Sequence, residues 1–312
     1  LVAGTFLAGK PIVPVSAHAG RGLDDLRAAL RAEAAALEPR EAGPFRLPID
    51  RIFTMPGAGV IVTGTCWSGE VTVGDTLLVE PGGHKVRVRE VQAHGRKAGR
   101  GGGGQRLALA LHGVKREDIQ RGCQVMAPGS APLTRLLDLR VDLFPGYQGV
   151  IKNRQRLHVH HAGREVLARI VLLDTEELGG DGPRTGLCQL HLEEPLVPRR
   201  GDRLVLRFYS PVTSIAGGAV LDPEPRRHKR FKDDVLETLE VLEHGDPAEL
   251  LRQNLRAAGL AGLPRAEAHG HEDEAAAVTV GKRVYLRELL EGEAAAIAEI
   301  LAEYARRFPL RR

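Results

Sequence analysis

The sequence has 312 residues, with 37 glycines, 19 prolines and a formal net charge of +4. This length is typical of two or three domains, and the glycine and proline content indicates many turns. The mild basic excess permits an RNA partner without requiring one, and the absence of a long apolar run argues against an integral membrane protein.

Cysteine and histidine usage gives no indication of a metal site. Cys66, Cys123 and Cys188 are far apart, form no CxxC pair and cannot build a disulfide framework. This usage is typical of a reducing compartment, so we expect a cytoplasmic protein. His158 and His160 project from the same face of a predicted strand, but a packed or solvated pair is more common than a metal-ligating one, and no metal site is predicted.

Residues 1–43 predict one strand and one helix. The sequence begins LVAGTF, with neither an initiator methionine nor a charged leader, which favours a chain that begins inside a larger protein. An apolar run at 12–15 precedes Ser16 and Ala17, and leucines then recur at helical spacing from Leu23. Because a single strand–helix unit cannot bury its own apolar face, we expect it to be the end of a larger α/β domain.

Residues 44–131 predict a first antiparallel β-barrel. Short apolar runs at 60–62, 76–79, 86–88 and 107–111 alternate with glycine- or proline-containing junctions. Short strands at this spacing are typical of a closed or nearly closed barrel.

Residues 132–225 show the same pattern of short apolar runs separated by turns, which predicts a second antiparallel barrel. Apolar positions in residues 226–312 then change to helical spacing, with a small β-wing predicted around 278–285. Helix, helix, hairpin and helix in this order is compatible with a winged-helix module. The predicted fold is therefore mainly β, with α-helical parts at both ends.

Several motifs carry a resemblance to a known family. The stretch FRLPIDRIFTMPGAGVIVTGT at 45–65, followed by SGEVTVGD at 68–75, resembles the second domain of the translational GTPases. GQRLAL at 104–109 and IQRG at 119–122 follow in the order that this barrel requires. AGGAVLDP at 216–223, RRHKR at 226–230 and HVHHA at 158–162 resemble the third domain of selenocysteine-specific elongation factors. The resemblance implies the end of a GTPase domain at 1–43, translation-factor domains II and III at 44–131 and 132–225, and the first module of a winged-helix array at 226–312.

The resemblance also implies a selenocysteine pocket formed by Asp50, Arg51 and Arg106. A selenol is a selenolate at neutral pH, and arginine is always charged and offers several donors to such an anion. Serine, the competing amino acid, offers no charge. Without the family, solvated strand ends would be the preferred interpretation of both arginines.

Other positions matching family motifs are expected to contact nucleotide or RNA. Ser16 and Ala17 correspond to the family's partial guanine-binding loop, although a strand followed by Ser-Ala and a helix is a weak signal on its own. The basic run after the second barrel provides candidate tRNA contacts, with a solvated linker as the alternative: Arg226, Arg227, Lys229 and Arg230.

The family's nucleotide chemistry is expected elsewhere in the parent protein. The sequence contains no GxxxxGK[ST] phosphate loop, DxxG switch or NKxD motif, and these groups hold the phosphates, Mg²⁺ and attacking water in GTPases. We therefore expect GTP and Mg²⁺ in the parent protein, but no catalytic residue, cofactor or GTP hydrolysis in this chain alone. The implied partners are selenocysteyl-tRNA, the ribosome at recoded UGA codons and an mRNA hairpin bound through further C-terminal modules, with a monomeric protein and no membrane contact.

Two alternatives remain. The first is another translational GTPase, such as a general elongation factor or the initiator-tRNA-binding subunit of an initiation factor; the LDP segment at 221–223 and the trailing helices argue against it. The second is a β-barrel and winged-helix RNA-binding adaptor with no role in nucleotide chemistry. The isolated strand–helix unit at the start argues against this alternative.

Overall fold

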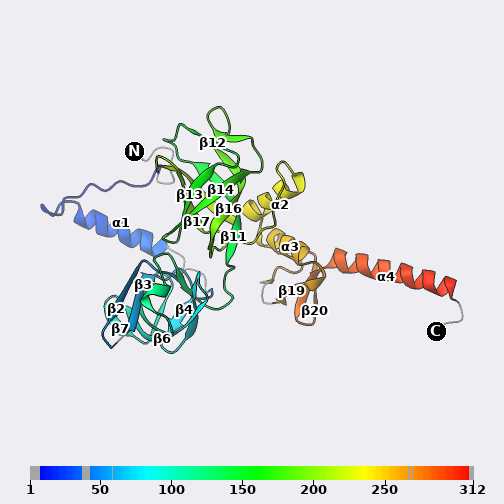
Figure 1. The fold of residues 1–312 in the computed structure, drawn as a ribbon, viewed down its shortest axis with the longest axis horizontal. Helices are drawn as coiled ribbons and strands as arrows, with labels where there is room; N and C mark the ends of the chain where they lie inside the picture. The colour runs from blue at the N-terminus through cyan, green and yellow to red at the C-terminus, as the bar shows by residue number, and fades with distance from the viewer. Residues whose placement is uncertain (1–7, 37–42, 58, 266–267, 269, 309–312) are drawn as a thin grey trace.

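The computed structural model describes residues 8–36, 43–57, 59–265, 268 and 270–308. Along the chain, a short N-terminal segment is followed by two β-rich units and by a C-terminal group of helices with a small sheet (Figure 1). The prediction of a mainly β fold with α-helical parts is confirmed.

The N-terminal segment contains one helix, α1 (Leu23–Ala36), with Asp24 and Asp25 in its first turn, where the helix dipole favours negative charge. The strand predicted at 12–15 does not form. Within the described residues no neighbouring strand offers it backbone partners, and only an isolated bridge joins Ser16 to Arg21. α1 buries none of its side chains among the described residues.

The first barrel, residues 45–126, is an antiparallel sheet whose strands follow the order β1-β10-β5-β6-β9-β3-β2. It is an open half-barrel, because β1 and β2 form its two ends rather than pairing with each other. β1 stops at Pro48, which has no amide to continue a ladder. The Pro48 carbonyl instead lies over Gly64, where an added Cβ would approach the carbonyl oxygen to 2.0 Å. The strands of this sheet are β1 (Arg46–Pro48), β2 (Arg51–Met55), β3 (Gly59–Thr65), β5 (Thr76–Glu80), β6 (His84–Ala93), β9 (Arg106–His112) and β10 (Gln124–Met126), with β7 (Arg96–Ala98) paired to β6. β4 (Glu70–Thr72) and β8 (Arg100–Gly102) form a separate pair, and a 3₁₀ turn lies at Arg116–Asp118.

Strand alternation separates an inner and an outer face of the first barrel. On β9, Leu107, Leu109 and Leu111 are buried in the core. Arg106, Ala108, Ala110 and His112 therefore belong to the outer face.

The second barrel, residues 134–222, is a closed ring of strands in the order β11-β16-β14-β13-β17-β18. Its core consists of alternating leucine, isoleucine and valine side chains such as Leu139, Val159 and Ile170. Its strands are β11 (Thr134–Leu143), β13 (Arg156–His161), β14 (Arg164–Leu172), β16 (Thr185–Leu196), β17 (Arg203–Phe208) and β18 (Ser214–Asp222), with β12 (Val150–Lys152) and β15 (Glu177–Gly179) paired beside the ring.

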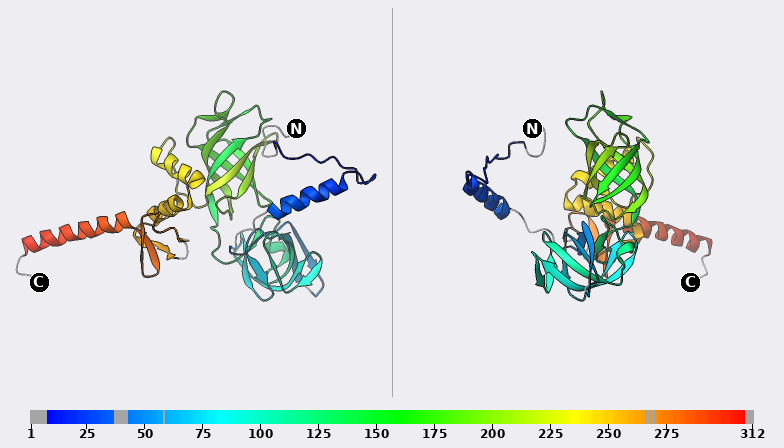
Figure 2. Two further views of the ribbon diagram at one scale, coloured as in Figure 1. Left: turned by 180° about the vertical axis from the view of Figure 1, so that it is seen from behind. Right: turned by 60° about the vertical axis from the view of Figure 1, so that its left-hand side comes forward.

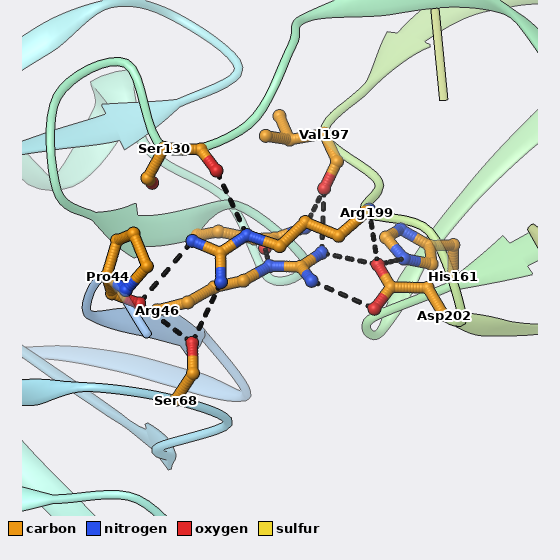
Figure 3. A network of polar contacts seen from close by, with 9 residues as sticks. Pro44, Arg46, Ser68, Ser130, His161, Val197, Arg199 and Asp202 are labelled. Atoms are coloured by element: carbon orange, nitrogen blue, oxygen red, sulfur yellow. Dashed lines mark hydrogen bonds and ion pairs between the residues drawn. The ribbon is translucent and has the colours of Figure 1, made fainter. Parts of the chain in front are cut away.

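A polar network joins the two barrels (Figure 3). Arg46 of β1 donates from its two terminal nitrogens to the carboxylate oxygens of Asp202, at 2.9 and 2.7 Å. His161 and the backbone amide of Arg199 also contact this carboxylate, at 2.8 and 2.9 Å. In the opposite direction, the Arg199 side chain donates to Ser68 Oγ at 2.9 Å. The network therefore crosses between the barrels in both directions.

The C-terminal part is anchored to the second barrel. α2 (Asp233–His244) buries Leu239 and Leu242 in a cluster with leucines of that barrel. The preceding linker is held by His228, whose Nε2 lies 2.7 Å from the buried Asp138 carboxylate.

α3 (Pro247–Ala258) begins with a capping box in which Asp246 and Glu249 exchange side-chain and backbone hydrogen bonds. It packs against a small sheet of β19 (Leu263–Pro264), β20 (Ala277–Val280) and β21 (Arg283–Leu286), after a 3₁₀ turn at Gly259–Ala261. α4 (Arg287–Arg307) then extends away from the rest, and the views of Figure 2 place α1 and α4 on opposite sides of the barrels.

Candidate functional site

The outer face of the first barrel brings the predicted site residues together. Arg51 of β2 lies opposite Thr63 of β3, which lies opposite Ala108 of β9. Arg106 is two positions before Ala108 and faces the same way. Asp50 comes directly before β2, where its amide donates to the Thr63 carbonyl at 2.9 Å.

Asp50 and Arg106 form a two-point ion pair. The guanidinium donates to the Asp50 carboxylate at 2.5 and 3.1 Å. The Thr63 hydroxyl donates to the same carboxylate at 2.7 Å. Both partners remain partly exposed, with 39% of the Asp50 side chain and 52% of the Arg106 side chain accessible. The pair is therefore ordered by its contacts and still reachable from solvent.

The charge state of Asp50 follows from these contacts. Partial burial raises the pKa of its carboxyl group, but the hydrogen bonds from Arg106 and Thr63 and the charges of Arg106 and Arg51 together bring the pKa below its ordinary value. Asp50 is thus ionised at neutral pH. Two guanidinium charges and one carboxylate leave the group with an excess positive charge.

Arg51 has a different environment from Arg106. Its side chain is exposed, and within the part of the chain that the structure describes its guanidinium makes no hydrogen bond. It is near enough to Asp50 for its charge to lower the pKa of that carboxyl. Arg51 therefore keeps all its donors available beside the Asp50–Arg106 pair.

A hollow of about 240 Å³ adjoins Arg106 on this face. Besides the start of β9, it is lined by Thr63, Gln92, His94 and Gly95. A second, mainly apolar hollow of about 270 Å³ continues along the same face and shares Gln92 and Ala108 with the first. Phe53, Met55 and Ile61 contribute to this second hollow.

Thr63, Gln92 and His94 were missed by the sequence analysis. Strand alternation in β3 would have placed Thr63 on the outer face beside Arg51 once the register was known. His94 has no comparable signal, because it follows the end of β6 and adopts a left-handed backbone conformation with φ of 52°.

The predicted guanine-loop residues Ser16 and Ala17 are not part of this group. The Ser16 amide donates to the Arg21 carbonyl at 3.0 Å, and its hydroxyl accepts from the Ala19 amide at 3.3 Å. The amide of Ala17 has no hydrogen-bond partner among the described residues. Of these two residues, Ala17 is the one whose backbone amide has no hydrogen-bond acceptor among the described residues.

The basic run after the second barrel divides into two kinds of residue. Arg226, Arg227 and Lys229 are exposed. The guanidinium of Arg230 instead donates to the carbonyls of Leu172 and Thr175, at 2.8 and 2.9 Å, and pairs with Glu176. Through these contacts Arg230 attaches the linker to the second barrel. Arg226, Arg227 and Lys229 therefore have exposed side chains, whereas Arg230 is engaged within the chain, and tRNA contact by all four stays a prediction.

Two further properties concern only the described residues. They contain no cluster of three or more histidine, cysteine, aspartate or glutamate side chains arranged to hold a metal ion. None of their helices is long and apolar enough to cross a membrane.

Comparison with known proteins identifies the family. The family model described as the β-barrel domain of selenocysteine-specific elongation factor matches residues 140–227. A selenocysteine-specific elongation factor from Desulfomicrobium baculatum is 35% identical over 99% of this chain and 51% of its own length. The factor from Escherichia coli is 36% identical over 73% of this chain and 35% of its own length. The chain thus spans about half, or less, of these curated relatives.

Solved structures agree with this result. The crystal structure of a bacterial selenocysteine-specific elongation factor, EF-Sec, superposes with a TM-score of 0.74 and 26% identity, covering 95% of this chain and 48% of that one. The apo elongation factor SelB from Methanococcus maripaludis shares the fold, with a TM-score of 0.59 and 24% identity over 69% of this chain and 51% of its own. The chain belongs to the family of selenocysteine-specific elongation factors.

Proposed function

We propose that the outer face of the first barrel binds the aminoacyl end of selenocysteyl-tRNA, with Arg51 and Arg106 pairing with the selenolate. The observation that carries this proposal is the Asp50–Arg106 pair beside a hollow, with the guanidinium of Arg51 left available. Asp50 fixes the orientation of Arg106, and Thr63 in turn holds Asp50.

The excess positive charge of this group favours an anion over a neutral ligand. A selenolate would meet two guanidinium groups, whereas the hydroxyl of serine would gain only neutral contacts. A hydrogen bond to a charged group contributes about 1.5–3 kcal/mol, which corresponds to roughly a tenfold to hundredfold preference per arginine. Because Asp50 already accepts from Arg106, Arg51 would supply the larger share of the free donors.

In the same proposal the whole protein delivers selenocysteyl-tRNA to the ribosome at recoded UGA codons in a GTP-dependent manner, and also recognises an mRNA hairpin. Bound GTP with Mg²⁺ would supply the conformational switch. Ala17 fits a role toward guanine because its amide is free to donate, whereas the amide of Ser16 is already bound. The exposed Arg226, Arg227 and Lys229 would contact tRNA phosphates.

The test compares the protection of the aminoacyl ester from hydrolysis in selenocysteyl-tRNA and seryl-tRNA when each is mixed with the chain. The unaltered protein should protect the selenocysteyl ester at lower protein concentration. Arg51→Ala and Arg106→Ala should each reduce this preference about tenfold or more. Arg100→Ala is a matched control, because this arginine lies on the same barrel and pairs with Glu70. Equal preference in all four proteins would contradict the assignment.

A further inference from the structure

A basic strip lies at the far end of the same outer face. We define it as Lys85, Arg87, Arg89 and His112, all of which are exposed. Lys85 and Arg87 alternate along β6 and point to the same side, and Arg87 lies directly opposite His112 of β9. Arg89 continues this alternation, immediately before the register shift that separates Val88 from Glu90.

No acidic side chain within the described residues pairs with any member of the strip. The acids closest to it along the strands are already engaged. Glu90 pairs with Lys97 at 2.7 Å, Glu80 accepts from the Gly83 amide at 2.9 Å, and Asp75 accepts from Thr72. Lys85, Arg87 and Arg89 thus bring three positive charges to one stretch of β6, with no carboxylate partner among the described residues. The strip is therefore a concentrated positive charge that an external anion would relieve.

The strip is continuous with the selenolate site and the two hollows. β9 carries Arg106 at one end of the outer face, Ala108 and Ala110 in the hollows, and His112 at the other end. The six residue-to-residue steps from Arg106 to His112 correspond to about 20 Å of strand. One extended ligand can thus reach from the charged group at Arg106, across the apolar hollow, to the strip.

We propose that the basic strip binds the phosphate backbone of the tRNA whose aminoacyl end occupies the site at Asp50, Arg51 and Arg106. This inference rests on the proposed function. Lys85 and Arg87 are separated by about 6.7 Å along the strand, which is close to the separation of neighbouring phosphates in an RNA chain. Arginine forks bind phosphate oxygens in pairs, and each neutralised phosphate releases counterions. The strip carries no base-reading geometry, so its contribution is independent of nucleotide sequence.

The experiment measures binding of an unacylated tRNA transcript to the full 312-residue chain over a series of salt concentrations. The triple variant Lys85→Ala, Arg87→Ala, Arg89→Ala should bind more weakly at low salt, and the slope of log affinity against log salt should fall by about 2 to 3. The matched control removes the same charge elsewhere through Arg27→Ala, Arg100→Ala and Arg135→Ala. Each control arginine already has an acceptor within the chain, namely Asp24, Glu70 and the Glu193 carbonyl. The slope measured for the control variant should differ from that of the unaltered chain by no more than about 1.

Several results would overturn the inference. They are a lack of measurable binding by the unaltered chain at low salt, an unchanged slope in the strip variant, or an equal loss in the control variant. Loss of binding to isolated small ribosomal subunits with tRNA binding retained would reassign the strip to ribosomal RNA. If the strip variant loses binding to polyglutamate as strongly as it loses binding to tRNA, the strip is a nonspecific anion-binding surface. Because the probe lacks an amino acid, failure here leaves the selenocysteine preference of Arg51 and Arg106 to its own test.

Discussion

The guanidinium of Arg46 in the first barrel and the carboxylate of Asp202 in the second form a two-point ion pair that is almost excluded from solvent. Only 2% of the Arg46 side chain and 11% of the Asp202 side chain remain exposed. The other donors of Arg46 reach Gln124 Oε1 at 2.5 Å and the Val197 carbonyl at 2.8 Å. All three guanidinium nitrogens of Arg46 thus donate hydrogen bonds, and the relative orientation of the two barrels is fixed by side chains 156 positions apart.

Arg46→Ala should destabilise the chain by about 3–5 kcal/mol, because it leaves the buried charge of Asp202 without its main partner. Trp67 provides the measurement: it is the single tryptophan, and the Arg46 guanidinium lies 5.0 Å from its ring centre. Its fluorescence, followed during denaturant unfolding, reports on the contact between the barrels. Arg27→Ala, in an exposed pair, should cost about 1 kcal/mol or less. Indistinguishable midpoints for the two variants would show that Arg46 does not hold the barrels together.

The same pair predicts a loss of stability at low pH. Burial raises the pKa of Asp202, but the hydrogen bonds from His161 and Arg46 and their charges outweigh burial and lower the pKa from 3.8 to about 2. Since the folded pKa lies below the unfolded one, the contribution is complete above about pH 4 and is lost as pH falls through about 2. A depression of this size corresponds to roughly 2 kcal/mol.

The measurement is the denaturant midpoint of unfolding between pH 5 and 2, for the unaltered chain and for Asp202→Asn. The unaltered chain should lose about 2 kcal/mol more over this range than the variant, which has no carboxyl group to titrate. Parallel curves for the two proteins would mean that ionisation of Asp202 does not contribute to the stability of the folded chain.

Local patterns in the sequence predicted most of the strands and helices. The predicted strand with His158 and His160 on one face coincides with β13 (Arg156–His161). The small β-wing predicted around 278–285 coincides with β20 (Ala277–Val280) and β21 (Arg283–Leu286). Apolar periodicity is a local signal, and these elements bury the faces that it marks. The strand expected at 12–15 does not form, because an apolar run becomes a strand only where another strand pairs with it.

Long-range pairing could not be predicted from one sequence. Arg46 occupies an ordinary alternating position, and nothing near it indicates burial against Asp202. Arg230 likewise has the composition of an exposed basic run, yet it donates to carbonyls of the second barrel. At the candidate site, the motifs indicated Asp50, Arg51 and Arg106, but the register that places Thr63 beside them comes only from the paired strands. The role of these residues in binding selenocysteine stays a prediction.

Lysine substitutions should separate the roles of the two site arginines. Arg106→Lys keeps the charge but loses the fork that meets both oxygens of Asp50. We expect it to reduce the preference for selenocysteyl-tRNA over seryl-tRNA about tenfold. Arg51 has no such fixed partner among the described residues, so Arg51→Lys should reduce the preference by less. Competition binding with the two aminoacyl-tRNAs measures both ratios. A larger effect of Arg51→Lys would mean that Arg51 is the geometrically constrained arginine.

The attachment of α2 to the second barrel provides a further test. Leu239 is fully buried in a cluster with Leu173, Leu187 and Leu221, and a nearby pair joins Arg140 to Glu243 at 2.5 Å. Leu239→Ala should cost about 2–5 kcal/mol through lost burial and a residual cavity.

Because the cluster joins α2 to the barrel, the cost should appear as local release of the C-terminal helices before the barrels unfold. Hydrogen exchange should show faster exchange in residues 233–244 of the variant, with β13 and β14 unchanged. Leu301→Ala, at an exposed position of α4, is the control and should leave the exchange of α2 unaltered. If exchange rises equally across the second barrel, α2 and the barrel unfold as one cooperative unit, and the cluster is part of the barrel core rather than a separable anchor.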